Sequence, residues 1–169
     1  MKGKILMKTN QANLGSLHSE ELINELISDT SNINHIEVIE NVINTLAEKG
    51  SAMVSYPPKS EHHLWKFNYG SVNVFVQLTG IEDEDTLTVW SAVLQLPAKN
   101  EGKLYRQLLE MNYSSTFEAR FGIIDNEIVV LATRALAGIS PGEVSRLLTV
   151  VATIADDNDE ALQSAFGFV

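Results

Sequence analysis

The sequence predicts an α+β domain with a five-stranded, mainly antiparallel sheet and helices packed on one face, in the order α-β-β-β-α-β-β-α. Two observations carry this prediction. Alternating apolar residues flank short turn signals at Gly70-Ser71 and at Asp125-Asn126, as in antiparallel hairpins. Three segments with apolar residues at helical spacing precede, separate and follow these strands.

The first helix of this domain is predicted to end at Gly50, where a left-handed residue suits a helix C-terminus. Its apolar residues recur every three or four positions: Ile33, Ile36, Ile39, Val42, Ile43 and Leu46. Ser19–Ser28 is predicted to form a shorter helix, and residues 1–16 a flexible tail. The single domain is therefore expected to span residues 17–169.

The strands begin after Gly50, where the apolar period changes from about four to two. Ala52–Tyr56 is a short strand that Pro57 ends. A type II′ turn at Gly70-Ser71 then fixes the register of the first hairpin. The predicted pairs on its apolar face are Tyr69 with Val72, Phe67 with Val74, Trp65 with Val76, and His63 with Leu78.

Thr86–Leu96 is apolar on both faces, which is typical of a central strand. Trp90, Ala92, Leu94 and Leu96 are assigned to one face, and Leu87, Val89 and Val93 to the other. The helix that follows has Asn100 as its predicted cap. Its inner residues are Leu104, Leu108 and Met111.

A type I′ turn at Asp125-Asn126 sets the second hairpin. It pairs Ile123 with Ile128, Phe121 with Val130, and Ala119 with Ala132 on the core face. Ser140-Pro141-Gly142-Glu143 combines a serine cap, a first-turn proline and a capping-box glutamate. The last helix starts there and extends as far as Phe166. Its acidic run predicts a break at Asp157-Asn158 or a solvated helix, and the functional alternative is a patch for a basic partner.

The net charge of −10, from 22 acidic and 12 basic residues, opposes binding to nucleic acid or anionic membranes. No run approaches the roughly 20 apolar residues of a spanning helix. The chain has no cysteine, which excludes disulfides, thiolate metal sites and cysteine nucleophiles. We expect a cytoplasmic protein without nucleic-acid or membrane partners.

Candidate catalytic and metal-binding residues are absent from the sequence patterns. His62 and His63 are neighbours in a strand, so their side chains point to opposite faces and do not chelate one ion readily. The acidic loop Glu82–Asp85 lacks the spacing and glycine of a calcium loop. Nucleophile-elbow, phosphate-loop and dinucleotide patterns are missing. We therefore expect no enzyme, no cofactor and no metal.

The second face of the sheet is the best candidate for a functional surface, because it mixes apolar residues with a polar surround. The candidate protein-binding residues are Phe75, Glu118, Arg120, Val129 and Leu131. They favour a protein-binding or chaperone-like regulatory module that acts as a homodimer or binds an unidentified protein. A covering helix, or scattered surface residues, would explain the same pattern. The alternative function is a small-ligand sensor with a pocket between helix and sheet near Trp65, Trp90 and Tyr105.

The C-terminal two-thirds of the chain resembles the YbjN-type family, within it a cyanobacterial branch. The resemblance lies in a strand, a helix ending in "LLEMN" (108–112), a phenylalanine- and valine-rich hairpin, and the helix entry at Ser140-Pro141. It spans about residues 33–166. It implies the fold of type III secretion chaperones, which are small acidic homodimers that hold extended protein segments. The shared residues are core and cap residues, so the resemblance implies no catalytic residue.

Overall fold

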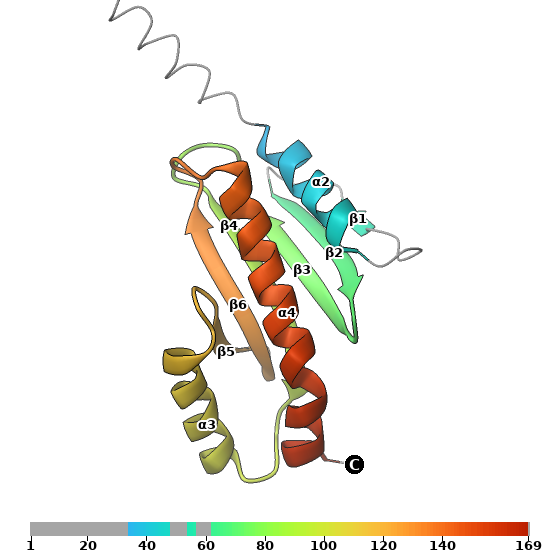
Figure 1. Ribbon diagram of the computed structural model, residues 1–169, viewed down its shortest axis with the longest axis vertical. Helices are drawn as coiled ribbons and strands as arrows, with labels where there is room; N and C mark the ends of the chain where they lie inside the picture. Colours follow the sequence, from blue (N-terminus) through green and yellow to red (C-terminus); the bar gives the residue numbers. More distant parts are fainter. Residues whose placement is uncertain (1–33, 48–53, 57–61, 169) are drawn as a thin grey trace, which may run out of the picture. The chain divides into compact units, whose positions relative to one another are not determined.

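Six antiparallel strands and three helices make up the part of the chain that the computed structural model describes, residues 34–47, 54–56 and 62–168 (Figure 1). The helices are α2 (His35–Leu46), α3 (Glu101–Ser114) and α4 (Pro141–Phe166). The strands are β1 (Val54–Tyr56), β2 (His63–Tyr69), β3 (Val72–Leu78), β4 (Thr86–Gln95), β5 (Arg120–Ile124) and β6 (Glu127–Ala135). Their order in the sheet is β1-β2-β3-β4-β6-β5.

The predicted fold class and element order are confirmed. The five predicted strands are β2 to β6, and the short strand expected at Ala52–Tyr56 is present as β1, which adds a sixth strand beside β2. The predicted tail at 1–16, the helix at Ser19–Ser28 and the domain start at residue 17 lie outside the described residues. From His35 onward the chain forms one compact unit.

Both hairpins have the predicted register. Phe67 pairs with Val74 in the first hairpin, and Phe121 pairs with Val130 in the second. At the second turn Asp125 and Asn126 have φ of 48° and 63°, the left-handed values that a type I′ turn requires. The two turns therefore determine which side chains face the core.

One face of the sheet is covered by α4, which contacts β2, β3, β4 and β6 and packs beside α2 (Figure 1). The helix begins with the predicted capping box: the Ser140 hydroxyl accepts from the Glu143 backbone N–H at 3.2 Å, and the Glu143 carboxylate accepts from the Ser140 N–H. Full burial of each large aliphatic side chain contributes about 1.5–3 kcal/mol. The fully buried sheet residues under the helices include Trp65, Phe67, Val74, Val76, Leu78, Leu87, Val89 and Val130.

Of the two alternatives predicted for the acidic run, the break at Asp157-Asn158 is wrong, because α4 is continuous for 26 residues, and the solvated helix is only partly right, because Asp159 is buried. Two carboxylates of the acidic run hold the first hairpin turn instead. Asp156 accepts from the Ser71 N–H at 2.7 Å, and the Ser71 hydroxyl lies 3.0 Å from both carboxylate oxygens of the buried Asp159. The acidic run thus fastens the C-terminal half of α4 to the β2–β3 turn.

Strand β4 and helix α3 each depart from the prediction in one detail. A register shift between Ala92 and Leu94 places Leu94 opposite Ile128 on the core face, whereas strict alternation had assigned it to the side of Trp90. Asn100 is the residue before α3, but its side chain makes no capping hydrogen bond, and its backbone is left-handed with φ of 50°.

We predict that Gly70→Ala destabilises the protein by about 1–3 kcal/mol, because alanine resists the positive φ of 52°. The added methyl group would also lie 2.0 Å from Asp156 Oδ1, so the carboxylate that holds Ser71 would have to move. Urea denaturation measures the loss. Gly102→Ala is the matched control, since nothing lies within 4 Å of its Cβ position. Equal stability of the two variants would contradict the role of Gly70.

Candidate functional site

The face of the sheet opposite α4 is called the open face. Its residues alternate with the core residues along each strand: Leu64, Lys66 and Asn68 on β2, Asn73, Phe75 and Gln77 on β3, Thr88, Trp90 and Ala92 on β4, Val129, Leu131 and Thr133 on β6, and Arg120 and Gly122 on β5. The buried apolar residues of α2, α3 and α4 all belong to one core cluster with the residues of the other face. None of these three described helices therefore covers the open face with its buried side.

One row of residues crosses the open face from strand to strand. By register Lys66 pairs with Phe75, Phe75 with Trp90, Trp90 with Leu131, and Leu131 with Arg120. We call these five residues the cross-strand row. The Phe75 and Trp90 rings stack with centroids 5.4 Å apart, and Lys66 Nζ lies 5.4 Å from the Phe75 centroid. The row thus has an apolar centre and a cation at each end.

Four of the five predicted site residues lie on the open face by register, but they differ in exposure. Phe75 and Leu131 are half-buried and remain available for contact, and Arg120 is exposed at the edge of the face. Val129 is only 1% exposed, so it supports the face rather than offering a contact. The Leu131 side chain lies over Gly122, where a Cβ would be 2.8 Å from Leu131 Cδ2.

Trp90 is the open-face residue that sequence reasoning missed. The sequence placed it near a pocket with Trp65 and Tyr105, but Trp65 pairs with Val76, whose β4 partner is Val89 rather than Trp90. Trp65 and Trp90 therefore lie on opposite faces of the sheet, so the two tryptophans cannot line one pocket between helix and sheet. Trp90 could have been placed beside Phe75 from the sequence, if the predicted pairing of β2 with β3 had been continued to the next strand, β4.

Glu118 does not lie on the open face, which corrects the prediction. The alternation of β5 begins only at Arg120, because Phe117 has a φ of 52° and the Ala119 N–H donates to the Thr116 carbonyl at 2.9 Å. This turn directs the Glu118 carboxylate to α4, where both of its oxygens accept hydrogen bonds from Arg146. Ala119 for the same reason lies before the strand and not in the predicted pair with Ala132.

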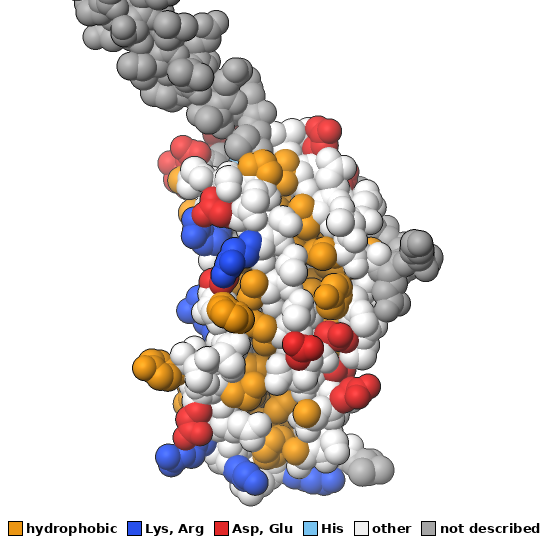
Figure 2. Space-filling model, in the orientation of Figure 1, with side chains coloured by type: hydrophobic (Ala, Val, Ile, Leu, Met, Phe, Trp, Pro, Cys, Tyr) orange, Lys and Arg blue, Asp and Glu red, His pale blue; other side chains and the backbone are white. Residues whose placement is uncertain are grey.

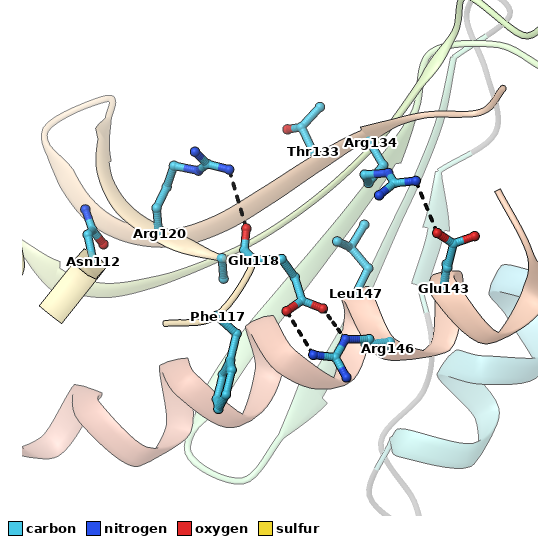
Figure 3. A pocket seen from close by; sticks show the side chains of 10 residues that line it. Asn112, Phe117, Glu118, Arg120, Thr133, Arg134, Glu143, Arg146 and Leu147 are labelled. Atoms are coloured by element: carbon cyan, nitrogen blue, oxygen red, sulfur yellow. Dashed lines mark hydrogen bonds and ion pairs between the residues drawn. The ribbon is translucent and has the colours of Figure 1, made fainter. Parts of the chain in front are cut away.

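Charged side chains of both signs gather beside the first turns of α4, at the left edge of the space-filling view (Figure 2). Glu118 and Arg120 both line a cavity of about 500 Å³ between the start of β5, the end of β6 and these turns (Figure 3). We call it the arginine cavity. Figure 3 shows Arg146 facing Glu118 and Arg134 facing Glu143. The distance from Arg134 to the Glu143 carboxylate is 3.2 Å. Its lining residues are Asn112, Phe117, Glu118, Ala119, Arg120, Thr133, Arg134, Glu143, Arg146 and Leu147.

Three charged groups of the arginine cavity, Glu118, Glu143 and Arg146, have pKa values shifted in the direction that favours the ionised form. The hydrogen bond from Arg146 lowers the pKa of Glu118, and the same contact raises the pKa of Arg146. Hydrogen bonds with Ser140 lower the pKa of Glu143. Such groups can bind ions of opposite charge, whereas proton transfer near neutral pH needs a group that titrates there.

The histidine pair and the acidic residues form no metal centre in the described ranges, where no three histidine or acidic side chains group as metal ligands. The His63 ring packs edge-on against Trp65 with centroids 5.7 Å apart. Among these same residues no helix is long and apolar enough to span a membrane.

Residues 36–164 match the model of the YbjN family, described as "Putative bacterial sensory transduction regulator". No curated protein is similar enough in sequence to count as a relative. A chain in the solved structure titled "Crystal Structure of the ExsC-ExsE Complex" is 18% identical with a TM-score of 0.47, over 75% of this chain and 91% of that one. The match of the family model confirms the resemblance found in the sequence.

We predict that Glu118→Gln lowers the free energy of unfolding by roughly 0.5 kcal/mol at pH 7, because it weakens a partly exposed ion pair. The folded-state pKa of Glu118 lies below its ordinary value, so the carboxylate stabilises the fold above about pH 5. This contribution is lost as the pH falls through the folded-state pKa. Urea denaturation of the wild type and of Glu118→Gln is measured at several pH values from 7 to 3. The difference between their free energies of unfolding should shrink as the pH falls.

Arg146→Gln is the control for this titration. When the guanidinium is absent, the effect of Glu118→Gln on the free energy of unfolding should shrink and lose its pH dependence. An effect that stays constant from pH 7 to pH 3 in the presence of Arg146 would mean that the Glu118–Arg146 pair does not stabilise the fold.

Proposed function

Because the chain belongs to the YbjN family, we propose that it is a non-enzymatic, protein-binding regulator of chaperone-like type whose contact surface is the open face. The observation that carries this proposal is the cross-strand row. Stacked Phe75 and Trp90 with Leu131 form an apolar centre, and the residues around them are polar or charged. This is the composition of a protein interface, with an apolar core and a hydrated rim.

The residue types of the row are those that contribute most to protein association. Tryptophan and arginine are enriched among interface residues that cost the most binding energy when truncated. Trp90 is already held by its stack on Phe75, so little side-chain entropy is lost when a partner covers it. The row is therefore ordered before binding.

The first proposed occupant of the open face is a second copy of the chain, which gives a homodimer. Two sheets pack face to face about 10 Å apart when each presents apolar side chains. Pairing of two open faces would cover both copies of Phe75, Trp90 and Leu131 without any change of fold. We also propose that this dimer acts in the cytoplasm.

A second occupant, an acidic segment of a different protein, is favoured by one observation. Both charged residues of the cross-strand row, Lys66 and Arg120, are cations in a chain of net charge −10. Complementary acidic groups on a partner would face both ends of the row, whereas a second copy brings two further cations.

Leu131→Glu tests both occupants. We expect the variant to fold, because Leu131 is half-buried at the open face and outside the core cluster, and to lose association. Light scattering after size-exclusion chromatography measures the homodimer, and capture from native lysate, read by mass spectrometry, measures other partners. A dimer lost by the variant supports self-association. A salt-sensitive partner lost by the variant supports the acidic segment.

Leu109→Glu is the matched control, since Leu109 is 69% exposed on α3 and outside the open face. It should keep every association that Leu131→Glu loses. If wild type and both variants are monomers and capture the same proteins, the open face is not a contact surface. If Leu131→Glu unfolds, as measured by circular dichroism, Trp90→Glu replaces it in the same comparison.

A further inference from the structure

The arginine cavity concentrates positive charge in a chain that is otherwise acidic. The sequence contains four arginines, and three of them, Arg120, Arg134 and Arg146, line this one cavity. They come from β5, β6 and α4, so the fold brings them together from separate elements (Figure 3). Arginine presents a planar fork of donors that matches a carboxylate or phosphate group.

The ion pairs within the cavity leave donors unused. Each guanidinium has five N–H donors, and the hydrogen bonds of Arg146 to Glu118 and of Arg134 to Glu143 use only some of them. Arg120 donates at 3.4 Å to the backbone carbonyl of Glu118. In the described part of the chain it has no carboxylate within ion-pair distance.

The charges of the cavity do not cancel. Three arginines and two glutamates, Glu118 and Glu143, line the cavity, which leaves one positive charge. Glu143 also caps the N-terminus of α4, whose backbone dipole adds positive potential there. An anion in the cavity would therefore meet a favourable potential in spite of the overall charge of −10.

Part of the lining is apolar. Phe117, Ala119 and Leu147 lie among the charged residues, and Phe117 is 78% exposed. Phe117 also adopts a φ of 52°, which is rare and strained for a bulky residue. Strained residues cluster at binding and catalytic sites, where the surrounding structure holds them in place.

We propose that the arginine cavity binds a small organic anion. A carboxylate or phosphate group of the ligand is held by Arg120 together with the free donors of Arg134 and Arg146. Its ring or other apolar part lies against Phe117 and Leu147. The volume of about 500 Å³ exceeds that of inorganic phosphate and falls within the range of small-molecule sites. This site differs from the pocket expected between helix and sheet, and Arg120 is the one residue that it shares with the cross-strand row.

A purely structural role explains only part of the cluster. The Arg146–Glu118 and Arg134–Glu143 pairs join the residues before β5, and the end of β6, to α4. They account for two of the three arginines. Arg120 has no such partner among the described side chains, and a structural role gives no reason for its position or for the exposed phenylalanine beside it in the lining.

The test is a titration of the full-length protein followed by NMR of its arginine side chains. The four Nε–H signals are assigned with single arginine-to-glutamine variants. Phenyl phosphate, benzoate, inorganic phosphate and sodium chloride are compared at equal ionic strength. We expect saturable shifts for Arg120, Arg134 and Arg146 but not for Arg106. Tighter binding of phenyl phosphate selects a phosphoryl ligand, and tighter binding of benzoate selects a carboxylate ligand.

Two variants are expected to change the affinity in opposite directions. Arg120→Gln should weaken binding about tenfold, because it removes a charge-assisted contact while leaving both ion pairs in place. Glu118→Gln should strengthen binding several-fold, because it removes a competing carboxylate. Arg106→Gln is the matched control, since Arg106 pairs with Glu110 on the exposed side of α3. Trp90→Glu changes the cross-strand row two strands away from Arg120 and should bind the anion like wild type, which separates this test from that of the open face.

Any of three results would overturn the proposal. The first is the absence of saturable shifts with either organic anion. The second is equal affinity of the wild type and Arg120→Gln while both keep the same melting temperature. The third is an equal loss of affinity in Arg106→Gln, which would show that the anion is attracted to any positive charge of the protein and not to this cavity. Phe117→Ala checks the apolar part, because it should remove the preference for phenyl phosphate over inorganic phosphate.

Discussion

The packing of α4 against one face of the sheet is the constraint on which the rest of the structure depends. Its inner residues lie on β2, β3, β4 and β6, so one 26-residue helix closes most of the core. The capping box at Ser140 fixes its start, and the bonds from Ser71 to Asp156 and Asp159 fix its second half. Because the buried apolar residues of the helices pack on that face, none of the described helices covers the other face with its buried side, and Phe75, Trp90 and Leu131 there remain half-buried.

The arginine cavity follows from the unequal lengths of the last two strands. β5 pairs with residues 127–131 of β6, whereas β6 continues to Ala135 and pairs there only with β4. The chain before β5 turns toward α4 at Phe117 instead of extending the sheet. Space is thereby left between this turn and the first turns of α4, and the side chains that surround it are charged.

The structure could be predicted from the sequence where the signal comes from residues close together in the chain. Turn residues at Gly70-Ser71 and Asp125-Asn126 set both hairpin registers, which placed Phe75 and Leu131 correctly on one face. Prediction from the sequence failed where a contact joins residues far apart in the chain, or where a residue adopts an unusual backbone conformation. The partner of Asp156 lies 85 residues away, in the first hairpin turn, and a phenylalanine with positive φ carries no sequence signal. Neither the role of the acidic run nor the orientation of the glutamate before β5 could therefore be predicted.

Arg120 is the residue that the two proposed surfaces share, and this decides how they can be separated. By register it ends the cross-strand row beside Leu131, and it is also one of the residues that line the arginine cavity. Any anion held by Arg120 changes the charge at that end of the row, so loss of Arg120 alters both surfaces at once. Leu131 belongs only to the row and Glu118 only to the cavity. A partner whose binding is lost in Leu131→Glu but kept in Glu118→Gln therefore contacts the apolar centre of the cross-strand row and not the arginine cavity.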